Sequence, residues 1–131
     1  MNKNHKNEVH ERWGDTAAYG EYVEKTKNYS KETWDSAAQE MNDIFARFAQ
    51  CKNSGTTADS EAAQALVSEL QVCISENFYH CTDEILRGLG QMYTADERFK
   101  SNINKHGDGT AQFVSDAIMI GVKKPGYTEF L

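Results

Sequence analysis

The spacing of apolar side chains along most of the chain is that of amphipathic helices. The clearest stripe recurs in steps of three and four residues, at Trp34, Ala38, Met41, Phe45 and Phe48. Such steps return to one face of an α-helix, so they predict a helix over residues 31–52. Ser30 is its expected N-cap, because a serine hydroxyl accepts a hydrogen bond from a free amide of the first turn. Gly55 is its expected stop signal.

Four later segments show the same periodicity. Each segment is given with its expected inward-facing residues in brackets: 60–77 (Leu66, Leu70, Cys73 and Ile74, followed by Phe78), 82–93 (Ile85, Leu86, Leu89, Met92), Thr94 to Gly107 (Phe99, Ile103) and 110–122 (Phe113, Val114, Ala117, Ile118). Thr94 and Glu97 have the spacing of a capping box, in which hydroxyl and carboxylate each accept from the other residue's amide. No segment alternates with a period of two, so the predicted fold class is all-α, in one small domain.

Residues 1–29 differ from the rest of the chain. They hold the aromatic residues Trp13, Tyr19, Tyr22 and Tyr29, but their only branched aliphatic residues are Val9 and Val23. Aromatic rings with polar tips give much contact area with few rotors and are typical of binding surfaces. Two alternatives follow. The segment either buries too little apolar surface to order until a partner docks against it, or it is an ordinary helix whose rings pack on the core.

Composition and charge narrow the class of partner. The chain has 131 residues, a net charge of −6 and 39% hydrophobic residues, which fits one globular domain. An acidic surface disfavours direct contact with a phosphate backbone and suits a cationic, amphipathic or peptidic ligand better. No run is long and apolar enough for a membrane span, and Met1 to His10 lacks the apolar core of a signal peptide, so a cytoplasmic location is expected.

The three cysteines, Cys51, Cys73 and Cys81, are odd in number and irregularly spaced, which predicts free thiols. Cys81 precedes a predicted helix start, where amide dipoles stabilise a thiolate and lower the thiol pKa. The alternative is that Cys81 is a small buried hydrophobic residue.

Catalytic and metal sites find little support in the sequence. His80 is adjacent to Cys81, and sequence neighbours do not face each other on a helix, so this pair is not expected to act as nucleophile and base. Cys73, His80 and Cys81 lack the spacing and the fourth ligand of a zinc site. A calcium loop near Asn102 lacks its closing acid, because Phe113 stands at that position. We therefore expect no enzyme activity, metal or cofactor.

Three motifs together carry a family resemblance. They are Glu11-Arg-Trp-Gly-Asp-Thr-Ala-Ala-Tyr19, Phe78-Tyr-His-Cys-Thr-Asp-Glu84 and Leu89-Gly-Gln-Met-Tyr-Thr-Ala-Asp-Glu-Arg-Phe99. In this order they resemble TipAS-type antibiotic-recognition domains, the effector halves of some MerR-family transcriptional activators, over about residues 8–122. The resemblance implies a globin-like fold of five to seven helices that recognises bulky hydrophobic antibiotics such as thiopeptides.

The resemblance also implies roles for single residues. In the family the cysteine of the second motif can add to a dehydroalanine of a thiopeptide, and that position is Cys81. An aromatic N-terminal lid, residues 1–29, would close over the drug above a helical core of residues 30–122, with residues 123–131 as a tail. The expected ligand contacts are Trp13, Tyr19 and Tyr22 in the lid, Cys81, and Tyr79, Met92 and Phe99 in the cleft, of which Phe99 equally fits the core.

The chain also departs from the family pattern. Leu70 and Cys73 stand where the family often has histidines, which implies a more apolar cleft. No helix-turn-helix or long coiled coil is present, so this chain is not expected to bind DNA itself and is expected to be a monomer. The leading hypothesis is the drug-sensing effector domain of a MerR-family regulator, with an N-terminal DNA-binding half as a candidate partner. The alternatives are a stand-alone resistance protein that sequesters the drug, and a protein–protein interaction module.

Overall fold

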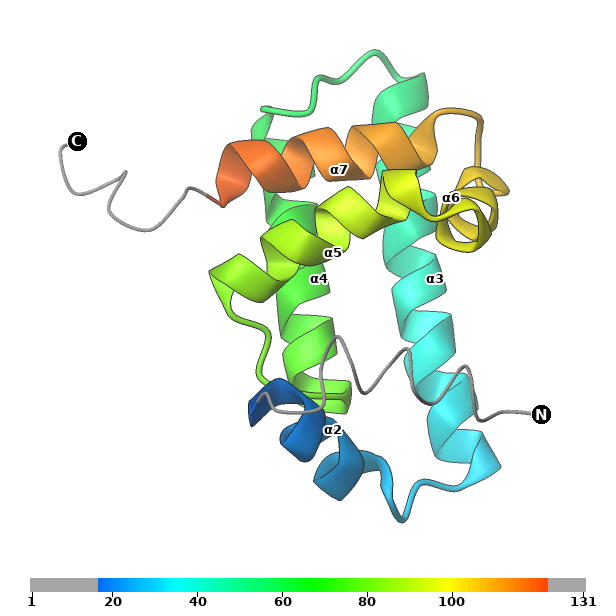
Figure 1. Cartoon of the computed structure of the whole chain (residues 1–131). Helices are drawn as coiled ribbons and strands as arrows, with labels where there is room; N and C mark the ends of the chain where they lie inside the picture. Colours follow the sequence, from blue (N-terminus) through cyan, green and yellow to red (C-terminus); the bar gives the residue numbers. More distant parts are fainter. Residues whose placement is uncertain (1–16, 123–131) are drawn as a thin grey trace, which may run out of the picture.

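The computed structural model describes residues 17–122, which form six α-helices and no strand (Figure 1). The helices are α2 (Ala17–Thr26), α3 (Lys31–Asn53), α4 (Glu61–Asn77), α5 (Asp83–Ala95), α6 (Glu97–Asn104) and α7 (Thr110–Gly121). The all-α prediction is therefore confirmed. Trp13 and the tail of residues 123–131 lie outside the described residues.

The long helices α3 and α4 run antiparallel, and α5 and α7 lie across them (Figure 1). The helix α7 packs on α3, α4, α5 and α6, which makes it the centre of the fold. Its apolar side chains meet those of the other helices in one core, whose largest fully buried members are Phe48, Leu70, Leu86, Val114 and Ile118. Most of the inward-facing residues predicted for these helices are in this core. None of the described helices is both long enough and apolar enough to cross a membrane.

Side-chain caps begin α3 and α4, and the cap of α3 is the predicted one. Ser30 Oγ accepts from the amide of Thr33 at 3.1 Å, which starts α3. Ser60 Oγ starts α4 in the same way, 3.1 Å from the amide of Ala63. Such a bond satisfies one of the amides that a helix start leaves without a partner. The turn after α3 also runs through the predicted glycine, because Gly55 has a φ of +85° that other residues rarely adopt.

The predicted capping box at Thr94 is wrong. The helix α5 continues to Ala95, and the Thr94 hydroxyl donates to the carbonyl of Gln91 inside that helix, at 3.2 Å. Asp96 is the N-cap of α6 instead, and its carboxylate accepts from the amide of Arg98 at 2.9 Å. Asp is preferred over Thr as an N-cap, and α5 continues past Tyr93, which is 3% exposed, before the chain turns at Asp96. The end of α6 at Asn104 also precedes the predicted stop at Gly107.

The expectation that Phe99 points inward is also wrong. Phe99 is 38% exposed on α6, and its ring lies 6.0 Å from the ring of Tyr93. A helix of eight residues can bury only one narrow face, and Ile103 takes that place with 2% of its surface exposed. Phe99 therefore covers the edge of the core rather than filling it.

Candidate functional site

Helix α2 is attached to the molecule through aromatic rings. Tyr22 lies 6.4 Å from the ring of Trp34 and 6.4 Å from that of Phe78, and Trp34 stacks on Phe78 at 6.0 Å. Tyr29 meets the edge of Trp34 at 5.4 Å. We call Tyr22, Tyr29, Trp34 and Phe78 the aromatic cluster. Offset and edge-to-face rings at these distances attract one another beyond the area they bury.

Apart from this cluster, α2 is loosely held. None of its residues 19–26 is fully buried, and α2 belongs to none of the closely packed helix pairs of the described chain. A ten-residue helix is marginal by itself in water, so its order depends on what it touches. For residues 17–29 the structure takes the packed alternative of the two predicted for the N-terminal segment. Residues 1–16 lie outside the described part of the chain.

Two hydrogen bonds supplement the rings. The carboxylate of Glu21 accepts from the backbone amide of His80, with Oε1 2.6 Å from the nitrogen. The hydroxyl of Tyr29 donates to the carbonyl of Asn77 at 2.6 Å. Asn77 in turn donates to Glu40 of α3 at 3.0 Å. Both bonds end where α4 stops, so α2 is fastened to the start of the connection between α4 and α5.

Residues 78–82, which we call the cysteine loop, form this connection and hold Cys81. The thiol of Cys81 is 2% exposed, and the residue is fixed by its backbone: its amide donates to Ser75 Oγ at 3.0 Å. The side chain of Gln71 donates to the carbonyl of Cys81 at 2.8 Å and to the carboxylate of Asp83 at 2.9 Å. Cys81 therefore lies inside the protein surface at a rigidly bonded loop.

Burial raises the pKa of Cys81 from its ordinary value of 9.0 to about 11, and the carboxylate of Asp83 adds to the shift. The prediction of a lowered pKa at the start of a helix is therefore wrong. Thr82 caps α5 by accepting from the amide of Ile85 at 3.2 Å, and Asp83 brings a negative charge into the first turn. The start of this helix thus already has the Thr82 hydroxyl as an acceptor and the Asp83 carboxylate as a negative charge. Loss of solvent around the thiol therefore has the larger effect on the pKa of Cys81. In this closed form Cys81 is a protonated, buried thiol.

Tyr79 and Tyr93 both lie near Cys81, and Tyr79 also lies near Tyr22 of α2. Burial raises the pKa of Tyr79, and the neighbouring acidic groups of Cys81 and Tyr22 raise it further. Burial likewise raises the pKa of Tyr93, followed by the effects of Tyr79, Cys81 and Cys73. Groups that perturb one another in this way lie close together. Tyr79 therefore lies close both to Tyr22 of α2 and to Cys81.

The structure thus brings together three of the predicted ligand contacts, Tyr22, Tyr79 and Cys81. Tyr19 is half-buried on α2, and Met92 is partly buried against the core. Phe99 lies on α6, against Tyr93 rather than in the aromatic cluster.

Sequence reasoning missed several residues of this region. Trp34 was assigned to the core stripe of α3, yet it is 37% exposed and serves as the ring on which Tyr22, Tyr29 and Phe78 meet. The available signal was the place of Trp34 in the first turn of a long helix. The helix α3 has 23 residues, six more than the 17 of α4 beside it. Glu21 carried no signal, because its partner is a backbone amide 59 residues away.

Leu70 and Cys73 do not line an open cleft. They are 0% and 1% exposed and belong to the core. Burial raises the pKa of Cys73 to about 11, with further contributions led by Glu40. The expectation that Leu70 and Cys73 make a cleft more apolar is therefore wrong for this structure, because both are core residues.

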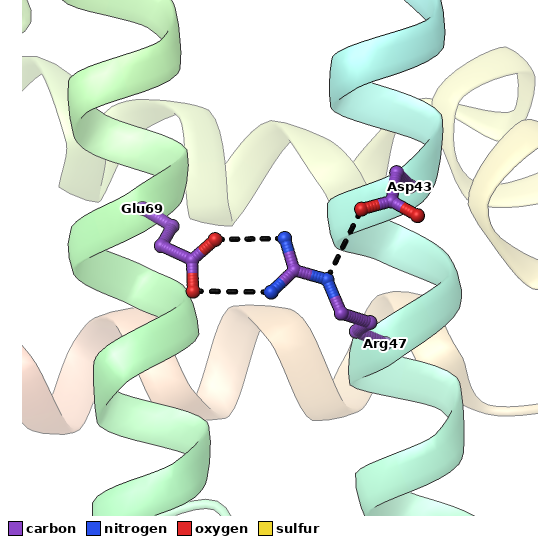
Figure 2. Close-up of polar contacts among 3 residues, drawn as sticks. All are labelled: Asp43, Arg47 and Glu69. Carbon is purple, nitrogen blue, oxygen red and sulfur yellow. Dashed lines mark hydrogen bonds and ion pairs between the residues drawn. The ribbon is translucent and has the colours of Figure 1, made fainter.

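A separate hollow of about 330 Å³ lies between α3 and α4, and it is lined by Glu40, Ile44, Arg47, Ser68, Glu69 and Val72. Figure 2 shows the ion pair at its edge, where Arg47 binds both carboxylate oxygens of Glu69, at 2.7 and 3.1 Å, and Asp43 at 3.2 Å. This contact raises the pKa of Arg47 and lowers that of Glu69. No predicted ligand contact lines the hollow. Among the described residues, no group of three His, Cys, Asp or Glu side chains could hold a metal ion.

The features described so far define a small all-helical domain with an aromatic helix, attached through ring contacts, near a buried cysteine. The family model of the TipAS antibiotic-recognition domain matches residues 5–120. The chain belongs to this family.

Known relatives extend this result. The HTH-type transcriptional activators TipA of Streptomyces coelicolor and Streptomyces lividans are 40% identical over 112 residues, which cover 86% of this chain and 44% of each relative. The HTH-type transcriptional activator mta of Bacillus subtilis is 37% identical over 100 residues, which cover 76% of this chain and 38% of that protein. This chain thus spans less than half the length of these curated relatives.

A solved structure also matches. It is TipAS of Streptomyces lividans in complex with nosiheptide, from a thiopeptide antibiotic multidrug resistance system, with a TM-score of 0.82 and 37% sequence identity. The match covers 93% of this chain and 85% of the other. The antibiotic-recognition fold is therefore shared across almost the whole chain.

Proposed function

We propose that this domain binds a bulky hydrophobic, thiopeptide-like antibiotic and is the drug-sensing effector domain of a MerR-family transcriptional regulator. The observation that carries the proposal is the 0.82 TM-score to a domain solved with nosiheptide, at 37% identity. The proposed partners of the domain are the drug and an N-terminal DNA-binding half, as in the HTH-type relatives. Its location is cytoplasmic, and its role is binding rather than catalysis.

The proposed binding region is the junction of α2 with the cysteine loop. Tyr22 and Tyr79 would supply ring surfaces to the drug, and Cys81 is close to Tyr79. Met92 at the core edge, Tyr19 on α2 and the more distant Trp13 and Phe99 complete the proposed contacts. A large apolar guest would replace the contacts that α2 makes with the core, so α2 would move aside and close again over it.

Binding of nosiheptide to the purified chain tests the proposal. A ligand present at a hundredfold its dissociation constant stabilises a fold by about 2.7 kcal/mol. For a chain of 131 residues this raises the melting temperature by roughly 10 °C. The same scan with streptomycin, a polar antibiotic of another class, is the control and should show no shift. Absence of a shift with nosiheptide, together with no heat in a calorimetric titration, would reject the proposal.

Covalent capture is a separable part of the proposal. The Cys81 thiol would lose its proton to solvent, and its sulfur would form a bond to the β-carbon of a dehydroalanine in thiostrepton. The α-carbon would then take a proton from water, so the adduct has the mass of protein plus drug and nothing leaves. Because the pKa of Cys81 is raised to about 11 by burial, this step requires that the cysteine loop first becomes accessible.

The intact mass after incubation with thiostrepton tests this step. The expected result is one added drug molecule in the wild type and none in Cys81→Ser, with Cys51→Ser as the control that keeps the adduct. An adduct that survives in Cys81→Ser would remove Cys81 from the mechanism. Calorimetry on the same variant then shows whether non-covalent binding is kept.

A further inference from the structure

We propose that Glu21 is a positioning residue that latches α2 onto the cysteine loop and thereby controls access to the Cys81 thiol. The proposal goes deeper into the proposed site but concerns the protein without drug. Its test can therefore fail while the proposed function stands.

The amide of His80 depends on α2 for its hydrogen bond. The helix α4 ends at Asn77 and α5 begins at Asp83, so this amide lies outside both helical ladders. Its acceptor is Glu21 Oε1, at 2.6 Å. A bond from an amide to a charged carboxylate is stronger than a neutral one. Glu21 therefore joins α2 to the residue directly before Cys81.

Three other amides of the loop have partners in α4. Phe78 and Tyr79 donate to the carbonyl of Ile74, and Cys81 donates to Ser75 Oγ. Release of α2 would thus leave the path of the loop largely in place while freeing one amide at His80. It would also take away the ring of Tyr22, which lies next to Phe78 and Tyr79. Tyr79 is close enough to Cys81 and to Tyr22 for both to influence its pKa, so release of α2 would change the surroundings of the thiol.

The weak attachment of α2 makes one bond matter. The helix has no fully buried residue among 19–26 and is in none of the closely packed helix pairs. Among the described contacts, opening of α2 therefore competes against the aromatic cluster, the Tyr29 bond and the Glu21 bond. Loss of any one of them shifts the balance towards the open form.

Alkylation by iodoacetamide, followed by peptide mass spectrometry of the drug-free chain, tests the latch. In Glu21→Ala the labelling rate of Cys81 should rise about tenfold. Cys73 is the internal control, because it is 1% exposed in the core and becomes reactive only when the protein opens more widely. Its rate should stay at the wild-type value. Glu21→Gln keeps an acceptor oxygen and should restore most of the protection.

The matched control is Glu24→Ala, because Glu24 lies on the same helix but pairs only with the exposed Lys27, three residues on. It should leave the Cys81 rate unchanged. Equal Cys81 rates in Glu21→Ala, Glu24→Ala and the wild type would overturn the proposal. So would a joint rise of Cys81 and Cys73, since that would show that Cys81 is protected by the whole fold rather than by α2.

Discussion

The substitution Tyr22→Ala should release α2 while the rest of the protein stays folded. Tyr22 contributes two of the ring contacts of the aromatic cluster, to Trp34 and to Phe78. Each such pair is worth about 0.5–1.5 kcal/mol beyond its buried area, so the two together contribute about 1–3 kcal/mol. One factor of ten in an equilibrium corresponds to about 1.4 kcal/mol. The ratio of docked to released α2 should therefore fall about 5- to 140-fold.

Hydrogen exchange followed by mass spectrometry measures this ratio directly. Amides of residues 17–29 should exchange faster by the same factor, because exchange occurs from the released form. Amides of α4 and α7 should exchange at the wild-type rate, since Tyr22 contributes nothing to the buried core. The melting temperature should accordingly change little. Val23→Ala is the control on the same helix, because Val23 is 44% exposed, and it should leave the exchange of α2 almost unchanged.

Two results would refute this reasoning. If α2 keeps its exchange rate in Tyr22→Ala, the aromatic cluster does not hold the helix. If α4 and α7 lose protection together with α2, the helix is part of the cooperative core, and the separable lid does not exist.

Three further predictions concern other features. Because burial raises the pKa of Cys81 from 9.0 to about 11, the folded protein should lose up to about 3 kcal/mol of stability between about pH 9 and pH 11 as this thiol ionises. Cys81→Ala should abolish this pH-dependent loss in urea unfolding. Asp96→Ala should speed hydrogen exchange in α6 more than Thr94→Ala does, and the reverse order would restore the capping box. Arg47 and Glu69 are 38% and 48% exposed, so a double-mutant cycle should give a coupling below about 1 kcal/mol that weakens with salt.

The helices were predictable because local signals and burial agree. The stripe that begins at Trp34 and the cap at Ser30 placed α3 almost to the residue, and the apolar periodicity of residues 60–77 did the same for α4. The start of α6 was not predictable in this way. Thr94 and Asp96 are both residues that cap helices, and the capping-box spacing favoured Thr94 although Asp is the better cap by itself.

The candidate site was less predictable, because it depends on contacts between distant segments. The resemblance pointed to Cys81, but a helix-start argument alone gave the wrong direction for its pKa, since it does not include burial. Glu21 and His80 are joined across 59 residues through a backbone atom, which no residue pattern records. Trp34 illustrates the same limit, because whether it fills the core or carries α2 depends on where α4 ends.

The location of the drug is the central claim, and hydrogen exchange with and without saturating nosiheptide tests it most directly. We predict slower exchange in α2 and in the cysteine loop, residues 17–26 and 78–82, with little change around the hollow that Arg47 and Glu69 border. Protection confined to that hollow, or no protection anywhere in a chain that binds the drug, would contradict the account.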